Sequence, residues 1–432
     1  MLRICYSILL FSLFNSINSQ DLVLGDYIPG NGLVFASSDD NHKTVIRGYS
    51  QSLFESKSIV FDSSEINDEN RYNRFRARRV RLRLSGNQLN PAFSYRLQVD
   101  LAQSDAGDGE LSGVLLDAWI GYKFSKKIKI IVGQKATPTD NIELQMASNS
   151  LQLPERSRLT SAFSSIREVG VFLDGKFKLG RKTVIKPMLN ITNGDGSNAI
   201  SNDFGGLKYG VRINILPLGT FRNFGQFRQV DMVRELTPKF MIGINGSYNV
   251  GISSRRGRGN GDILYMNNLD EYSLPNFLKY GGDLLFKFRG FSLIAEFVKT
   301  KAFIPEDISQ RVRNNGTVST SFNGSVENYI KGRMMLGSGL NIQGGYLFKS
   351  LFSIDGRYTN LMPDEYSFMN NSAFYNRNKY YTIGISKYLF KNYSYKIQAS
   401  YTYVDDAIIR DVFEVEYQGN ENIFRLMVQI AF

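Results

Sequence analysis

Short segments in which apolar and polar residues alternate recur along most of this chain. In the clearest of them, arginines alternate strictly with aliphatic residues: Arg79, Arg81 and Arg83 on one side, Val80, Leu82 and Leu84 on the other. Alternation with a period of two predicts a β-strand whose two faces meet different environments. The polar face is entirely cationic, so it meets either the solvent around a soluble sheet or the inside of a barrel whose other face meets lipid.

The segment 393–404 favours the membrane. One of its faces has tyrosines at both ends and aliphatic residues between them, namely Tyr393, Tyr395, Ile397, Ala399, Tyr401 and Tyr403. Tyrosine is enriched at both membrane interfaces, and a strand of about 9 to 11 residues crosses the apolar layer. A strand of a soluble sandwich has no comparable reason to place tyrosines at both ends.

Sixteen segments of this kind are present, and an even number is typical of bacterial single-chain barrels. We expect strands at about residues 44–54, 75–86, 92–102, 114–124, 128–135, 166–177, 183–192, 206–216, 239–250, 281–289, 291–300, 333–348, 351–360, 379–390, 393–404 and 422–432. The connections after even-numbered strands are short and those after odd-numbered strands are long, as in outer-membrane barrels. Only 216–238 is long where a short turn is expected, so it holds either a small amphipathic segment or an error in the strand count. The predicted fold class is an all-β transmembrane antiparallel barrel.

The cost of placing arginine in lipid determines the orientation of the arginine strand. An arginine on the lipid face near the bilayer centre costs about 2–4 kcal/mol, so Arg79, Arg81 and Arg83 are expected to face the lumen. The preceding Arg74, Arg76 and Arg78 have the opposite phase. Either they project outward, or a β-bulge at Arg78/Arg79 turns them inward as well.

Both ends of the chain carry export signals. Residues 1–19 read as a cleaved signal peptide and 20–43 as a polar leader before a barrel domain over 44–432. The last strand places Phe424, Leu426, Val428, Ile430 and Phe432 on one face, which resembles the C-terminal signal of outer-membrane barrels. We expect a Gram-negative outer-membrane location, with lipid and lipopolysaccharide as partners. Cys5 is the only cysteine and lies in the signal peptide, so the mature chain forms no disulfide.

The charge narrows the range of partners. The formal net charge is +12, which suits nucleic acid, anionic lipid or an acidic solute. Export and the lack of a nucleic-acid-binding motif argue against nucleic acid. His42 is the only histidine and precedes the first strand, so neither a Ser–His enzyme nor a usual zinc site is expected. We predict no catalytic activity, cofactor or metal.

Several motifs together resemble the phosphate-selective porin O and P family. They lie at residues 75–86, 95–100, 117–122, 131–138, 154–157, 167–171 and 193–196, in this order and spacing. The resemblance implies a trimeric, sixteen-stranded porin with a basic channel wall. It also implies an inward-folded third extracellular loop, here 136–165.

The candidate pore-lining and anion-binding residues come from both the wall and this loop. They are Arg79, Arg81, Arg83, Arg96, Lys129, Lys135, Lys208 and Arg212 from predicted strands, and Arg156 and Arg158 from the loop. Arginine stays charged and offers a planar fork that matches phosphate oxygens. Three functions remain open: a channel for small anions such as phosphate, a general non-selective porin, and a structural or adhesive barrel with a plugged lumen.

Overall fold

The structure is a computed structural model of the 432-residue chain. It describes residues 22–24, 32–37, 41–61, 70–89, 92–102, 114–197, 204–258, 263–313, 315–370, 377–410 and 416–432. The predicted signal peptide, 1–19, lies outside the described residues.

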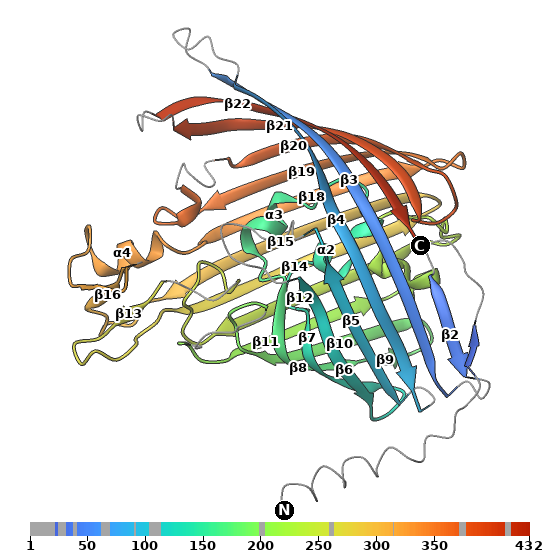
Figure 1. Cartoon of the computed structure of the whole chain (residues 1–432), viewed down its shortest axis with the longest axis horizontal. Helices are drawn as coiled ribbons and strands as arrows, with labels where there is room; N and C mark the ends of the chain where they lie inside the picture. The colour runs from blue at the N-terminus through green and yellow to red at the C-terminus, as the bar shows by residue number, and fades with distance from the viewer. Residues whose placement is uncertain are drawn as a thin grey trace, which may run out of the picture.

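The described strands form a closed, 16-strand antiparallel β-barrel (Figure 1). Its strands are β3 (Lys43–Phe61), β4 (Asn70–Gln88), β5 (Phe93–Asp100), β6 (Leu115–Lys123), β7 (Ile128–Ala136), β8 (Arg167–Gly175), β10 (Thr183–Thr192), β11 (Lys208–Leu216), β12 (Lys239–Asn249), β14 (Asn276–Phe288), β15 (Phe291–Phe303), β18 (Gly337–Leu347), β19 (Phe352–Pro363), β20 (Lys379–Tyr388), β21 (Tyr395–Arg410) and β22 (Glu416–Ala431). The last strand of the barrel, β22, pairs with its first strand, β3, from Gly419 opposite Phe61 to Ala431 opposite Tyr49. Each of the sixteen predicted strands corresponds to one of these, so the predicted fold class is confirmed.

The alternation along each strand separates an apolar outside from a polar inside. On β11, for example, Val211 is 42% exposed and Ile213 is 40% exposed, whereas Arg212 between them is fully buried. The same holds on β21, where Ile397 is exposed and Lys396 and Gln398 are buried. A barrel surrounded by lipid requires this separation, because apolar side chains meet the hydrocarbon and polar ones meet the lumen.

The two ends of the barrel differ as the sequence predicts. At the short-turn end, β14 and β15 are joined through residues 289–290, and β18 and β19 through 348–351. The opposite, long-loop end carries the long connections. These include a three-stranded sheet of β13 (Tyr265–Met266), β16 (Gln310–Val312) and β17 (Val318–Ser319), and the helix α4 (Val326–Lys331). In Figure 1 these elements extend beyond the barrel on the left.

Part of the segment 20–43, predicted as a polar leader, forms two short strands. Strand β1 (Leu22–Leu24) pairs with β2 (Leu33–Ser37), and β2 pairs with the start of β3. The short β9 (Phe177–Leu179) follows β8 and also pairs with β10. The strand count around 216–238 is correct, and this connection holds a 3-10 segment, η2 (Arg222–Phe227).

The segment between β7 and β8 supplies most of the helical structure of the interior. It contains α2 (Ile142–Gln145), η1 (Ser148–Ser150) and α3 (Arg158–Phe163). Apolar side chains of α3 pack in a cluster with Val298 of β15 and Leu361 of β19. No helix in the described part of the chain is long and apolar enough to cross a membrane.

Candidate functional site

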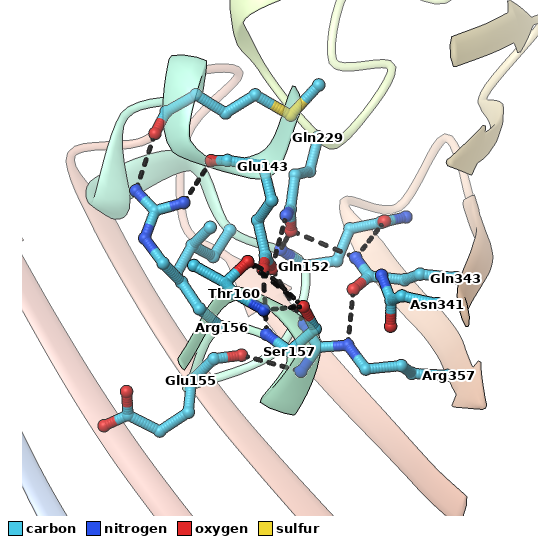
Figure 2. A network of polar contacts seen from close by, with 12 residues as sticks. Glu143, Gln152, Glu155, Arg156, Ser157, Thr160, Gln229, Asn341, Gln343 and Arg357 are labelled. Carbon is cyan, nitrogen blue, oxygen red and sulfur yellow. Dashed lines mark hydrogen bonds and ion pairs between the residues drawn. The ribbon is translucent and has the colours of Figure 1, made fainter. Parts of the chain in front are cut away.

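The segment 137–166 is held together by a buried carboxylate. Glu143 Oε2 accepts hydrogen bonds from Ser157 N (2.8 Å), Ser157 Oγ (2.8 Å) and Thr160 Oγ1 (2.6 Å). The Ser157 hydroxyl also accepts from Thr160 N at 3.3 Å and so caps α3. The carboxylate therefore ties α2 to the first turn of α3 (Figure 2).

The same carboxylate joins the segment to the barrel wall. Arg357 Nη2 on β19 donates to Glu143 Oε1 at 3.3 Å, and Arg156 donates to the Glu143 carbonyl oxygen. Burial alone would raise the pKa of Glu143, but the charges of Arg357 and Arg156 and the hydroxyl donors outweigh it, and the pKa lies below its ordinary value. Glu143 is therefore a carboxylate at neutral pH.

Further polar contacts fasten the segment across the interior. Gln152 Nε2 donates to Ser292 Oγ of β15 (2.8 Å) and to Asp355 Oδ1 of β19 (2.9 Å). Its carbonyl oxygen accepts from Gln398 of β21 at 2.7 Å. From β4, which lies nearly opposite β15 in the barrel, Arg81 donates to Ser148 Oγ at 2.9 Å. Because these strands lie on different sides of the barrel, the segment crosses its interior.

A second segment enters from the short-turn end. The connection 217–238 carries Gln229, which is fully buried and accepts from Gln152 N (2.8 Å) and Gln343 Nε2 (3.0 Å). Its own amide donates to Glu143 Oε1 at 3.2 Å. Lys287 Nζ of β14 donates to three carbonyl oxygens of the connection, at 2.8, 2.8 and 3.0 Å. The two inserted segments therefore meet at Gln229 (Figure 2).

Beside these segments a cavity of about 970 Å³ runs along one part of the barrel wall. Its wall residues come from β3 to β8, from β10 and from β19 to β22. Among the lining residues, twenty are Arg or Lys and five are Asp or Glu. The cavity is therefore strongly cationic.

The arginine run of β4 lines this cavity along its whole length. The pairing of β3 with β4 shifts between Gln51 opposite Arg79 and Ser52 opposite Ala77, so Arg78 is the extra residue of a β-bulge. Beyond the bulge the strand has the opposite phase, and Arg74 and Arg76 also line the cavity. Of the two predicted alternatives, the bulge is correct.

Acidic side chains neutralise part of this run. Arg79 Nη2 lies 2.9 Å from Glu155 Oε2, and Arg78 Nη2 lies 3.1 Å from the same oxygen. Arg74 Nη2 lies 2.8 Å from Glu55 Oε1. Arg81 Nε lies 2.7 Å from Asp100 Oδ2. These residues form a paired region in the middle and at the long-loop end of the cavity.

The cations nearer the short turns are paired less closely or not at all. Arg96 Nη1 lies 3.8 Å from Asp117 Oδ2, which binds Arg167 more closely at 3.0 Å. Arg83 faces the cavity without an ion pair or side-chain hydrogen bond to any residue that the structure describes. Lys129 Nζ lies 4.7 Å from the centre of the Trp119 ring.

The remaining candidates from this side of the barrel also line the cavity. Lys135 Nζ lies 3.7 Å from Asp174 Oδ2. Arg156 donates to the Met146 carbonyl oxygen at 2.8 Å, so it braces its own segment as well as facing the cavity. Arg158 lines the cavity from the start of α3.

Lys208 and Arg212 do not line this cavity, contrary to their predicted place in the pathway. Both are buried; Lys208 pairs with Glu168, and Arg212 Nη2 lies 2.5 Å from Asp283 Oδ1. Arg212 Nη1 also donates to the Asp140 carbonyl oxygen at 3.1 Å. The inserted segment thus covers β11, and these cations hold it there.

Several cavity residues are absent from the predicted set. Among them are Arg47, Glu55, Glu155, Arg228 and Arg425. Arg47 is the cross-strand partner of Arg83, and Arg425 Nε lies 2.6 Å from Glu55 Oε2. Arg425 could have been found, because it alternates with apolar residues in the last strand. Arg228 had no signal in the sequence, because it lies in a connection without regular alternation.

In the ranges that the structure describes, no three His, Cys, Asp or Glu side chains converge as metal ligands.

Known proteins resemble this chain in part of its sequence and in its fold. The family model described as phosphate-selective porin O and P matches residues 58–218, which confirms the predicted resemblance over that part of the chain. Among solved structures, the outer-membrane expressed OmpT of Vibrio cholerae is 9% identical with a TM-score of 0.50, covering 91% of this chain and 98% of that one. The outer membrane channel DcaP of Acinetobacter baumannii is 12% identical with a TM-score of 0.46, covering 93% of this chain and all of that one (100%). The likeness to OmpT concerns the fold alone. No curated protein matches the chain.

Proposed function

We propose that this chain is an outer-membrane porin through which small anions, phosphate among them, diffuse passively. The observation that carries the proposal is the cavity along the inner wall, with twenty basic and five acidic lining residues. A passage lined in this way attracts anions and repels cations, because the low-dielectric wall focuses the field into it. The matched family description and the apolar outer surface support the same function.

Only some of the cations on the cavity wall form close ion pairs with carboxylates, and this arrangement suits transport better than tight binding. A solute must leave as well as enter, so a channel needs several weak sites rather than one strong site. Glu55, Glu155 and Asp100 lower the net charge in the paired region, while Arg83 has no ion pair with any described residue. The resulting succession of cations allows an anion to exchange one partner for the next.

The proposal extends to selectivity for phosphate and to a homotrimeric assembly. Arginine guanidinium groups offer parallel N–H donors that match phosphate oxygens. We propose a homotrimer in a bilayer with lipopolysaccharide. A general porin would share the barrel and the location but would not discriminate by charge.

Planar-bilayer recording across a KCl gradient tests the main proposal. We expect an anion-selective reversal potential and partial block of the chloride current by phosphate. Arg83→Gln is expected to reduce the selectivity, and Lys301→Gln, which removes an exposed charge outside the cavity, is the matched control. A cation-selective potential would exclude the anion pathway. Chloride current without phosphate block would leave a general anion porin.

A structural or adhesive barrel is the second candidate, because the long-loop end carries an ordered sheet and helix. It requires a lumen closed by the inserted segments, and the cavity beside them argues against that. Absence of any conductance from correctly folded protein would favour this candidate.

A further inference from the structure

The end of the cavity near the short turns differs chemically from the rest. There the connection 217–238 contributes Phe224, Phe227 and Arg228 to the cavity lining, and the wall contributes Arg83 and Lys129. We call these five residues the inner subsite.

Two of the three cations of the inner subsite lack a close carboxylate partner in the described part of the chain. Within the described residues, neither Arg83 nor Arg228 has a carboxylate oxygen within 4.0 Å. The Arg228 guanidinium instead lies 5.1 Å from the centre of the Tyr393 ring. The positive charges of Arg96, Arg47 and Arg228 act on Arg83, and the negative charge of Asp117 offsets part of their effect. An anion that enters this group relieves the repulsion among these cations.

The aromatic rings of the inner subsite are exposed to the cavity. Phe224 is 72% exposed, and its backbone has φ 55°, in the left-handed region that a bulky side chain rarely adopts. Phe227 is 38% exposed and faces the Lys186 ammonium at 5.3 Å. Neighbouring Phe221, by contrast, is buried in a cluster with Ile142 and Leu216. Phe221 therefore anchors the connection, whereas Phe224 and Phe227 present apolar surface to whatever passes.

We propose that the inner subsite favours anions that carry an aromatic or other apolar group over small anions of the same charge. The carboxylate or phosphate of such a solute would pair with Arg83 and Arg228, and its apolar part would cover the exposed rings. Burial of apolar area on both partners adds to the charge attraction, and only a solute with both groups gains both terms. This inference rests on the proposed anion pathway and defines a preferred class of solute within it.

Block of the chloride current by benzoate, compared with acetate, tests the inference. Both probes carry one negative charge, so a difference between them reports the apolar part. We expect benzoate to block at lower concentration than acetate. Phe224→Ala and Phe227→Ala are each expected to raise the half-blocking concentration of benzoate about threefold to tenfold, as expected for one lost ring contact, with little change for acetate.

Matched variants separate the roles of ring, charge and segment. Leu236→Ala changes an exposed apolar residue of the same connection that does not line the cavity, and we expect it to leave both blocks unchanged. Phe224→Leu keeps the connection apolar, so loss of block there as well assigns the effect to the ring. Arg83→Gln is expected to weaken the block by both probes.

The outcomes of these experiments separate failure of the inner subsite from failure of the proposed anion pathway. Equal block by benzoate and acetate in an anion-selective channel would overturn the inner subsite and leave the anion pathway intact. A benzoate preference that survives both alanine variants would also overturn it. A cation-selective channel would instead remove the proposed function itself.

Discussion

The Arg79 guanidinium on β4 lies 2.9 Å from the Glu155 carboxylate on the inserted segment, with Arg79 almost fully buried. This pair joins the barrel wall to the segment at the border of the cavity. It has two consequences: it neutralises part of the arginine run, and it holds the segment against that wall.

Replacement of Glu155 by glutamine should therefore increase anion selectivity and weaken the fold together. Arg78 and Arg79 would lose their carboxylate partner, which adds positive charge to the cavity and removes charge-assisted hydrogen bonds worth about 2 kcal/mol. Reversal potentials and denaturant unfolding in detergent measure the two effects. Glu306→Gln, at an exposed position without these contacts, is the control. Unchanged selectivity in Glu155→Gln would show that Glu155 does not set the field of the cavity.

Low pH should destabilise the inserted segment, because its carboxylates become protonated. Burial alone would raise the pKa of Glu155, but the charges of Arg78 and Arg79 outweigh it and hold the pKa well below its ordinary value. The carboxylate therefore contributes stability above the unfolded-state pKa of about 4.3, and this stability is lost as the pH falls from there toward the folded-state pKa.

Unfolding measurements between pH 7 and pH 3 check this. We expect the contribution of Glu155, taken as the difference in free energy of unfolding between the wild type and Glu155→Gln, to be constant above about pH 5 and to decline below about pH 4.3. The free energy of unfolding of Glu155→Gln should then decline less steeply than that of the wild type, by up to about 1.4 kcal/mol per pH unit. An identical decline in the variant would assign the acid sensitivity to other groups.

Gln229 should couple the two inserted segments. Its replacement by alanine leaves donors on Gln152 and Gln343 and an acceptor on Glu143 without this partner. We expect destabilisation of about 2 kcal/mol and larger fluctuations of the single-channel current, because the segments can then move separately. Gln310→Ala, which alters a polar contact beyond the barrel, should leave the current steady. A quiet Gln229→Ala channel would show that the segments are held independently.

Substitutions of Arg212 and Arg83 should affect protein stability and ion selectivity separately. Arg212→Ala leaves the buried Asp283 without its cation, and such a loss typically costs about 3–5 kcal/mol. We expect a clear fall in unfolding midpoint with nearly unchanged ion selectivity. Arg83→Gln should have the reverse effect, because Arg83 faces the cavity without an acidic partner in the described structure. Strong loss of selectivity in Arg212→Ala would return Arg212 to the anion pathway.

The barrel itself was predictable because strand periodicity is a local property. Alternation at Val211, Arg212 and Ile213, repeated in sixteen segments, identifies the strands and which face of each is apolar. The cost of arginine in lipid then determines which face turns inward. Turn lengths identify the two ends, and only the connection 217–238 departed from the pattern.

Tertiary structure alone decided which inward-facing cations line the cavity. Alternation places Arg83 and Arg212 equally inside, but the inserted segment packs against β11 and covers Arg212, while Arg83 stays beside the cavity. The bulge at Arg78, the pairing of Arg79 with Glu155 and the entry of Gln229 likewise depend on contacts between distant parts of the chain. A strand's periodicity specifies the face on which a side chain lies; what that side chain meets across the lumen depends on how the whole barrel closes around its inserted segments.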